Sequence, residues 1–308
     1  MFLKPISLVA ALALALPAAA QTWDMPTPYP DATFHTKNIR GFAEDVAAAT
    51  DGKLTITVHS AGSLFPHAEI KNAVRSRQVP IGEFLLSRLS NEDPAFGLDA
   101  QPFLATSYAD ARRLWGAQKP VIADLLAAQD LMPLYAVAWP PQGLYTRAEI
   151  ATADDLAGLR FRAYNAQLEE MAVLANAAPV QVEVPDIPQA FTTGQVEAMI
   201  TSSSTGVNSK AWDFLSHFSP INAWLPKNVV VVNKRVFDGL DADTQAAILD
   251  AAAKAEARGW EMSEAEASSM TEELAKNGVT VYEPSAELKA GLEEIGTKMM
   301  ETWEAKAS

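Results

Sequence analysis

The segment Gly158-Leu-Arg-Phe-Arg-Ala-Tyr164 carries the clearest structural signal in the chain. Its apolar residues alternate with Arg160, Arg162 and Tyr164, which is the two-residue period of a β-strand. An arginine on a strand suits a carboxylate, because the planar guanidinium donates two parallel charge-assisted hydrogen bonds to the two oxygens. The pattern therefore predicts that Arg162 is an anion-binding residue. An ordinary ion pair between this arginine and a surface acid is the alternative.

On both sides of this segment, short apolar runs alternate with amphipathic helical stretches. Such alternation is typical of βα units and predicts an α/β fold with mostly parallel sheets. Helices are expected over 36–50, 66–76, 107–116, 120–129, 167–175 and 185–193, and strands over 54–59, 81–86, 132–139, 160–164, 180–184, 198–201 and 229–233.

The C-terminal third differs from the rest, because Asp243 to Asn277 contains no proline and a single glycine, Gly259. The segment is rich in helix-favouring residues, and its apolar positions recur at helical intervals. Asp241 or Asp243 is a plausible N-cap, and Gly278 a plausible end. One or two helices fit the pattern, and we favour one. At about 1.5 Å per residue it exceeds the width of a small domain and would join two domains as a shared spine.

The first twenty residues have the features of an export signal. Lys4 precedes an apolar stretch from Ile6 to Leu16, and Pro17-Ala-Ala-Ala20 is a small-residue cleavage site. The apolar stretch is too short for a stable membrane span, and no second long apolar run follows. We therefore expect cleavage after Ala20 and a periplasmic protein without direct membrane insertion.

The chain has 308 residues and no cysteine, so its stability depends on a large hydrophobic core and not on disulfides. The length after the leader suggests two domains. We expect α/β domain 1 at 21–140 plus 226–258, and α/β domain 2 at 141–225 plus 259–308.

The net charge is strongly negative. It is −14 for the full chain, and loss of Lys4 with a leader that contains no acid makes it about −15. Such acidity argues against nucleic acid or an anionic membrane as a partner. If the ligand is itself an anion, a local positive group has to attract it.

Residues for catalysis are few. The sequence has no HExxH, CxxC, GxSxG, P-loop or GxGxxG motif, and its histidines show no metal-ligand spacing. We therefore predict no catalytic residue, cofactor or metal. An active site assembled from distant residues keeps a periplasmic enzyme acting on a small acid as an alternative.

Several further segments are candidates for a ligand site. Ser202, Ser203 and Ser204 follow a strand, where open α/β sheets hold ligands, although a turn-forming cluster is the alternative. Glu83 is a candidate acceptor for a ligand hydroxyl or a partner of a surface base. Aromatic residues at segment edges belong either to the core or, collectively, to an apolar cavity with a few polar anchors: Phe34, Phe84, Trp139, Tyr145 and Trp224.

The order of several motifs resembles one known family across nearly the whole chain after the leader. These motifs are Thr50-Asp-Gly-Lys-Leu-Thr-Ile-Thr-Val58, Ala61-Gly-Ser-Leu64, Gln101-Pro-Phe-Leu104, Asp155-Leu-Ala-Gly-Leu-Arg-Phe-Arg162 and Pro188-Gln-Ala-Phe-Thr-Thr-Gly-Gln-Val-Glu-Ala198. The family is that of the periplasmic solute-binding proteins of tripartite ATP-independent periplasmic (TRAP) transporters, the DctP-like dicarboxylate receptors. The combination from Arg162 to Gly194 is its most specific part.

The resemblance implies a two-domain periplasmic binding protein of type II-like architecture, with a ligand cleft between the domains and a long helix spanning both. It implies a receptor that captures an organic acid and delivers it to TRAP membrane subunits. The carboxylate-binding arginine of the family falls on Arg162. The binding protein of an ATP-driven importer, which has a similar architecture, is the rival class.

The chain departs from the family pattern at three places. The second arginine of a G-x-R turn is Tyr145, an asparagine is lost in the segment from Glu197 to Ser204, and a later polar turn becomes Asn222-Ala-Trp224. Loss of charge with gain of aromatic surface favours an aromatic or apolar monocarboxylate. A C4-dicarboxylate or another 2-oxo or hydroxy acid is the alternative.

Overall fold

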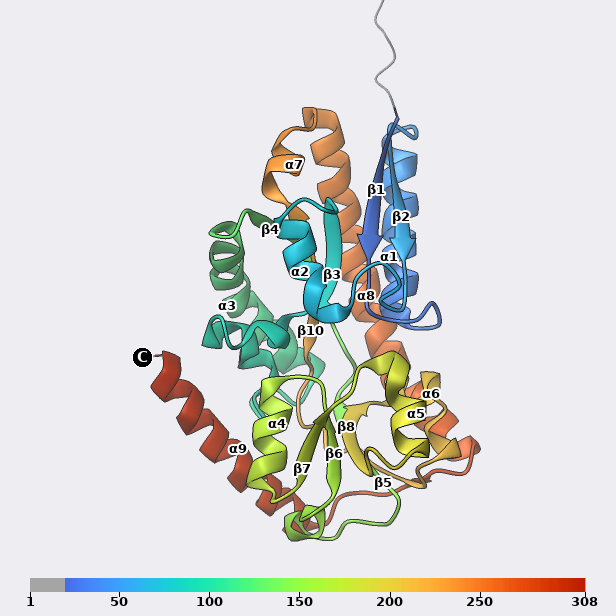
Figure 1. Ribbon diagram of the computed structural model, residues 1–308, viewed down its shortest axis with the longest axis vertical. Helices are drawn as coiled ribbons and strands as arrows, with labels where there is room; N and C mark the ends of the chain where they lie inside the picture. The colour runs from blue at the N-terminus through green and yellow to red at the C-terminus, as the bar shows by residue number, and fades with distance from the viewer. Residues whose placement is uncertain (1–19, 308) are drawn as a thin grey trace, which may run out of the picture.

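The computed structural model describes residues 20–307, and the predicted leader, apart from Ala20, lies outside them. These residues form an α/β fold with two domains, one above the other in Figure 1. The predicted fold class is confirmed.

The first domain is built around a three-stranded sheet and a separate parallel strand pair. The sheet has the order β3 (Ile81–Leu85), β10 (Lys227–Asn233), β4 (Leu131–Ala138), and the pair is β1 (Gln21–Pro26) with β2 (Leu54–His59). The helices of this domain are α1 (Phe34–Ala49), α2 (His67–Arg75), α3 (Tyr108–Ala127) and α7 (Lys234–Asp238), with short 3-10 turns η1 (Leu86–Leu89) and η2 (Pro94–Ala100).

The second domain contains a six-stranded mixed sheet. Its order is β11 (Thr280–Val281), β9 (His217–Ser219), β5 (Gln142–Thr146), β8 (Ala198–Ser202), β6 (Arg160–Ala163), β7 (Ala178–Gln181). Its helices are α4 (Ala166–Leu174), α5 (Ile187–Thr192) and α6 (Ser203–Asn208), with 3-10 turns η3 (Ala153–Leu156), η4 (Val184–Asp186) and η5 (Ala211–Asp213).

The chain passes between the two sheets three times: from β4 to β5, from β9 to β10, and through the C-terminal third from β10 to β11. The first passage includes residues 139–141 and the second residues 220–226. These positions support the predicted domain boundaries near residues 140 and 226, which remain a prediction.

The predicted long helix is confirmed as α8 (Ala242–Lys276), a single helix of 35 residues, about 52 Å long at 1.5 Å per residue. The Asp241 side chain caps it by accepting from the Thr244 N–H at 2.9 Å. After it, Gly278 has a φ of +92°, which favours glycine. The helix packs on α1 and β4 in the first domain and on α6 and β11 in the second.

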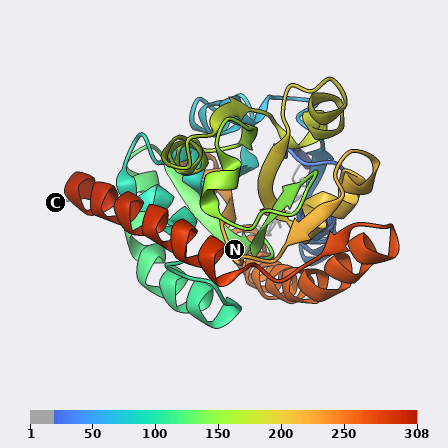
Figure 2. The ribbon, with the colours of Figure 1, turned by 90° about the horizontal axis from the view of Figure 1, so that it is seen from below.

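A helix that the sequence did not predict, α9 (Ala286–Ala307), also links the domains. It packs on α4 and η3 and continues to η2, where the Trp303 indole N–H donates to the Pro94 carbonyl at 2.8 Å. Figure 2 shows this helix along the outside of the molecule.

Two expectations about the elements were wrong. The sheets are not mostly parallel, because β10 and β5 run antiparallel to both of their neighbours. Each of these strands enters its sheet directly from the other domain and so starts at the end where its neighbours finish. The helices expected at 107–116 and 120–129 form one helix, α3, which continues through Pro120.

Candidate ligand-binding site

A cavity lies where strands of the two domains end or begin. Its empty space is about 360 Å³ with the solvent-facing mouth included. The wall contains residues of both domains: Tyr29, His67, Leu85, Trp139, Gln142, Arg162, Tyr164, Glu183, Val184, Thr201, Thr205 and Pro226.

Arg162, on β6, places a buried cation in this wall. The side chain is 1% exposed, and its Nε donates to the Val182 carbonyl at 3.0 Å. Its Nη1 has no hydrogen-bond partner within residues 20–307, and no carboxylate of that part of the chain forms an ion pair with it. Burial lowers the pKa of the guanidinium to about 10, so it is cationic at neutral pH. A buried cation with a free N–H is costly unless a partner is supplied, so this position suits an anion.

A directed chain of hydrogen bonds holds Tyr164 beside Arg162. The Trp224 indole N–H donates to the Tyr164 hydroxyl at 3.1 Å. The same hydroxyl donates to Gln142 Oε1 at 3.0 Å. Gln142 Nε2 then donates to the Pro140 carbonyl at 2.8 Å. The Arg162 Cζ lies 4.9 Å from the centre of the Tyr164 ring, because residues two apart on a strand share a face.

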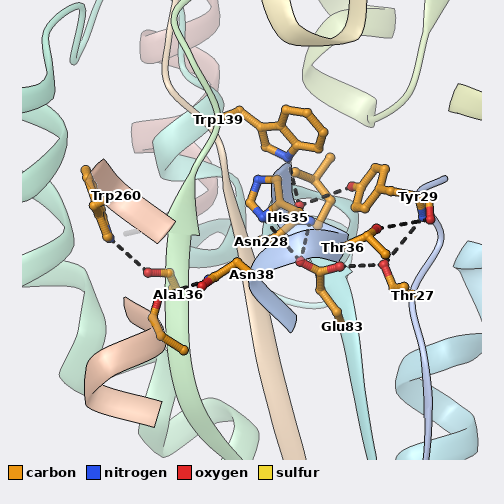
Figure 3. Close-up of polar contacts among 12 residues, drawn as sticks. Thr27, Tyr29, His35, Thr36, Asn38, Glu83, Ala136, Trp139, Asn228 and Trp260 are labelled. Carbon is orange, nitrogen blue, oxygen red and sulfur yellow. Dashed lines mark hydrogen bonds and ion pairs between the residues drawn. The ribbon is translucent and has the colours of Figure 1, made fainter. Parts of the chain in front are cut away.

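A second network fixes the aromatic rings contributed by the first domain. The Tyr29 hydroxyl and the Trp139 indole both donate to Asn228 Oδ1, at 3.1 and 3.0 Å (Figure 3). The Asn228 amide nitrogen donates to Glu83 Oε1 at 3.0 Å, and the Thr27 hydroxyl donates to Glu83 Oε2 at 2.6 Å. His35 Nδ1 lies 3.3 Å from Glu83 Oε1.

Glu183 joins the two domains at the edge of the cavity. His67 Nδ1 lies 3.2 Å from its Oε2, and Arg88 Nη1 donates to its Oε1 at 2.8 Å. Arg88 Nη1 also donates to the Tyr164 carbonyl at 2.9 Å. Burial raises the pKa of the Glu183 carboxyl, but the hydrogen bond from His67 and the charges of Arg88 and Arg162 outweigh it and hold the pKa at about 2. Glu183 is therefore an anion at neutral pH.

The hydrogen bonds of His67 fix its neutral tautomer. Its Nε2 accepts from the Leu85 backbone N–H at 3.1 Å, so the proton sits on Nδ1 and is directed at Glu183. Burial lowers the pKa of His67, because the charged form would lose its hydration, and this effect exceeds the opposing effect of Glu183.

Of the residues predicted from sequence, Arg162 and Trp139 line the cavity and the serines do not. Ser202 caps α6 by accepting from the Thr205 N–H at 3.0 Å, and Ser203 donates to the Ala267 carbonyl of α8 at 3.3 Å. Ser204 accepts from Asn208 at 3.4 Å. Their neighbours Thr201 and Thr205 reach the wall instead.

The other predicted residues lie behind the wall. Tyr145 donates to the Ser202 carbonyl at 3.1 Å in the second domain's core, and Phe84 faces away from Leu85 toward the α2 and α3 side. Phe34 supports Trp139 edge-on at 5.4 Å, Trp224 supports Tyr164, and Glu83 lies beneath Asn228.

Several wall residues were not nominated from the sequence. Tyr164 had a local signal, because it shares the strand face of Arg162. Gln142 follows the double proline Pro140-Pro141, and a single glutamine in a turn is no signal of a ligand site. Tyr29, His67 and Glu183 come from distant segments and had no signal of their own.

Within the described residues, no group of three or more His, Cys, Asp or Glu side chains is arranged to hold a metal ion. None of the helices over 20–307 combines the length and apolar character needed to cross a bilayer.

Comparison with known proteins places the chain in a family. Residues 27–306 match the model of bacterial extracellular solute-binding protein, family 7, and the chain belongs to this family. The Bordetella pertussis receptor DctP6, whose structure is described as binding pyroglutamic acid, is 44% identical, with a TM-score of 0.92 over 94% of this chain and 96% of that one.

A TRAP solute-binding protein from a marine metagenome, in complex with co-purified pyroglutamate, is 41% identical, with a TM-score of 0.92 over 94% of this chain and 95% of that one. A solute-binding protein of Sulfitobacter is 24% identical over 80% of this chain and 77% of its own length. The predicted identity, a TRAP-type solute-binding receptor and not an enzyme, is thus confirmed. The protein is a periplasmic receptor of this class, and its partners are a small acid ligand and TRAP membrane subunits.

Proposed function

We propose that this receptor captures pyroglutamate, a small cyclic monocarboxylate, and delivers it to its TRAP membrane subunits. The observation that carries the proposal is the buried Arg162 side chain, which lines the cavity and whose Nη1 has no hydrogen-bond partner within residues 20–307. Two hydrogen bonds to a charged partner at about 1.5–3 kcal/mol each would stabilise a bound carboxylate. The relatives above 40% identity that are described with pyroglutamate support the choice of ligand.

The charges around the cavity favour one carboxylate over two. Arg162 supplies one cation, and Glu183 stands at the same wall as an anion with a pKa of about 2. The first carboxylate of a ligand neutralises Arg162, but a second would meet Glu183 in a poorly solvated place. C4-dicarboxylates should therefore bind weakly. The rings of Tyr29, Trp139 and Tyr164 offer flat apolar surface to a small ring.

We also propose cleavage after Ala20. The first strand, β1, begins at Gln21, so removal of the leader takes away no element of the described fold.

Titration calorimetry of ligand-stripped protein tests the ligand. We expect pyroglutamate to bind at micromolar concentration or tighter, and succinate, benzoate and proline at least about tenfold more weakly. Proline has the ring and the carboxylate, but its cationic nitrogen lacks the neighbouring carbonyl. A panel in which succinate binds best would overturn the proposed ligand.

A pair of variants tests Arg162. Arg162→Met should abolish detectable binding. Arg160→Met is the matched control, because Arg160 lies two residues earlier on the same strand, is exposed and pairs with Glu197 at 3.0 Å. Equal affinity of the Arg162→Met and Arg160→Met proteins would remove Arg162 from the site.

A further inference from the structure

Two aromatic residues of the cavity wall donate hydrogen bonds to a buried amide behind them. Tyr29 and Trp139 line the cavity and both donate to one atom, Oδ1 of Asn228 (Figure 3). The other end of this amide, Nδ2, donates to Glu83. Asn228 and Glu83 are 2% and 1% exposed and lie behind the two rings.

The chemistry at both ends fixes the orientation of the Asn228 amide. The Trp139 indole N–H can only donate, and the Glu83 carboxylate can only accept. The amide oxygen therefore faces the rings and the amide nitrogen faces Glu83. The reverse orientation would set two N–H groups against each other at Trp139 and two oxygens against each other at Glu83.

This orientation decides what Tyr29 can offer to a ligand. Its O–H is used by Asn228 Oδ1, so its oxygen retains only lone pairs. No group within residues 20–307 donates to that oxygen. At Tyr164, by contrast, the oxygen already accepts from Trp224 while its O–H donates to Gln142. The cavity therefore combines a free donor, at Arg162, with a free acceptor, at Tyr29.

We infer that Tyr29 is a specificity-determining residue whose oxygen accepts a hydrogen bond from an N–H of the ligand, and that Asn228 and Glu83 are positioning residues that set this polarity. The inference rests on the proposed function, since pyroglutamate carries a ring N–H beside the carbon that bears its carboxylate. The lactone of the same shape, 5-oxotetrahydrofuran-2-carboxylate, has a ring oxygen there. It would place one acceptor against another.

The test compares the two compounds by calorimetry on wild type and on Tyr29→Phe. Wild type should bind the lactone at least about tenfold more weakly than pyroglutamate, because a buried acceptor would lose its donor. Tyr29→Phe should bind pyroglutamate about tenfold more weakly and the lactone no more weakly than wild type does. The ratio of the two dissociation constants then falls toward one. A purely structural role of Tyr29 would weaken both compounds equally.

Two controls isolate the direction of the hydrogen bond. Tyr135→Phe also removes a buried hydroxyl of the first domain. This hydroxyl has no hydrogen-bond partner within residues 20–307, and Tyr135 does not line the cavity, so the change should leave the ratio unchanged. The paired exchange Glu83→Gln with Asn228→Asp keeps an acceptor in front of Tyr29 and Trp139 and should keep the preference for pyroglutamate. If the paired variant does not fold, the comparison of Tyr29→Phe with Tyr135→Phe still tests whether Tyr29 determines the preference for pyroglutamate.

The outcomes separate the two proposals. If wild type binds pyroglutamate and the lactone equally, or if Tyr29→Phe weakens both to the same extent, the role of Tyr29 is overturned and the ligand stands. If wild type does not bind pyroglutamate, the proposed function is overturned, and the inference with it.

Discussion

At the scale of the residue, Arg162 has no ion pair in the part of the chain that the structure describes, and this local charge matters more to a ligand than the net charge of the protein. The net charge of −14 repels an anion at long range, but salt screens that repulsion beyond about 8 Å at physiological ionic strength. The Arg162 guanidinium acts over a few ångströms, where burial excludes screening water. An acidic receptor can therefore bind an acid, provided that the local cation has no carboxylate of its own.

The lowered pKa of His67 predicts a pH dependence of stability. Above its ordinary pKa of 6.5 the side chain is neutral both folded and unfolded, and its contribution is constant. Below that value the unfolded chain takes up a proton that the folded protein resists, so stability is lost as pH falls. One group contributes at most about 1.4 kcal/mol per pH unit. Urea unfolding between pH 8 and 5 measures this loss.

His67→Gln is the comparison for that experiment, because an amide can accept from Leu85 and donate to Glu183 without titrating. Its free energy of unfolding should fall less than that of wild type below pH 6.5. The other histidines are common to both proteins, so any effect of theirs cancels in the comparison. Glu183 does not contribute here, since its stabilisation is lost only below about pH 4.5, on the way to its folded pKa of about 2. Parallel pH curves for the two proteins would contradict the assignment to His67.

The sequence predicted only part of the cavity wall. Period-two alternation predicted that Arg162 lies on a strand, and β6 contains it, because strand geometry is local. Glu83 and the serines were expected at the ligand, yet Glu83 lies under Asn228 and Ser202 caps α6. Whether a side chain reaches a cavity depends on segments distant in sequence, and one sequence carries no direct record of those contacts.

At the scale of the element, α8 depends on a close approach at Gly259. A Cβ built there would lie 2.5 Å from Val137 Cγ2 in β4 and 2.6 Å from Asn38 Nδ2 in α1. Both neighbours are buried, and Asn38 is held by its bond to the Ala255 carbonyl at 2.9 Å. Glycine is unfavourable in a helix, but here it lets the helix contact the sheet and α1 together.

We therefore predict opposite effects for two glycine-to-alanine changes in helices. Gly116→Ala in α3 should stabilise the protein by about 1 kcal/mol, because its Cβ would meet nothing within 4 Å and alanine is the better helix former. Gly259→Ala should destabilise it by about 1–3 kcal/mol through overpacking. Chemical denaturation measures both. A stabilised Gly259→Ala protein would show that β4 and α1 yield easily at this contact.

The elements that the sequence predicted are those with strong local periodicity. Strand β2 and helix α8 were predicted within a residue or two, since each has a clear pattern and clear ends. The antiparallel direction of β10 and β5 was not predicted, because it follows from which domain the chain has just left. Pro120 was read as a boundary, but packing of α3 on η2 and β4 outweighs the missing hydrogen bond.

At the scale of the whole molecule, a few polar contacts hold the two domains together across the cavity. Arg88 and His67 of the first domain reach Glu183 of the second, and Asn165 Nδ2 donates to Ser87 Oγ at 2.9 Å. None of these contacts needs a ligand atom. Each contact joins the first domain to the second, so a separation of the domains would break it. We therefore expect these contacts to slow ligand release without changing how the ligand is held.

Arg88→Met tests whether these contacts keep the domains closed without holding the ligand. The variant loses the bonds to Glu183 and to the Tyr164 carbonyl, while Arg88 itself does not line the cavity. We expect ligand dissociation to be roughly tenfold faster and association unchanged in stopped-flow experiments, since release requires opening and capture does not. Arg235→Met, which breaks the exposed pair with Asp130 at 2.9 Å within the first domain, should leave both rates unchanged. Small-angle scattering should show that ligand addition makes wild type more compact. At equal saturation, the decrease in size should be smaller for Arg88→Met.

If association were slower and dissociation unchanged, Arg88 would guide the ligand into the site and would not keep the domains closed.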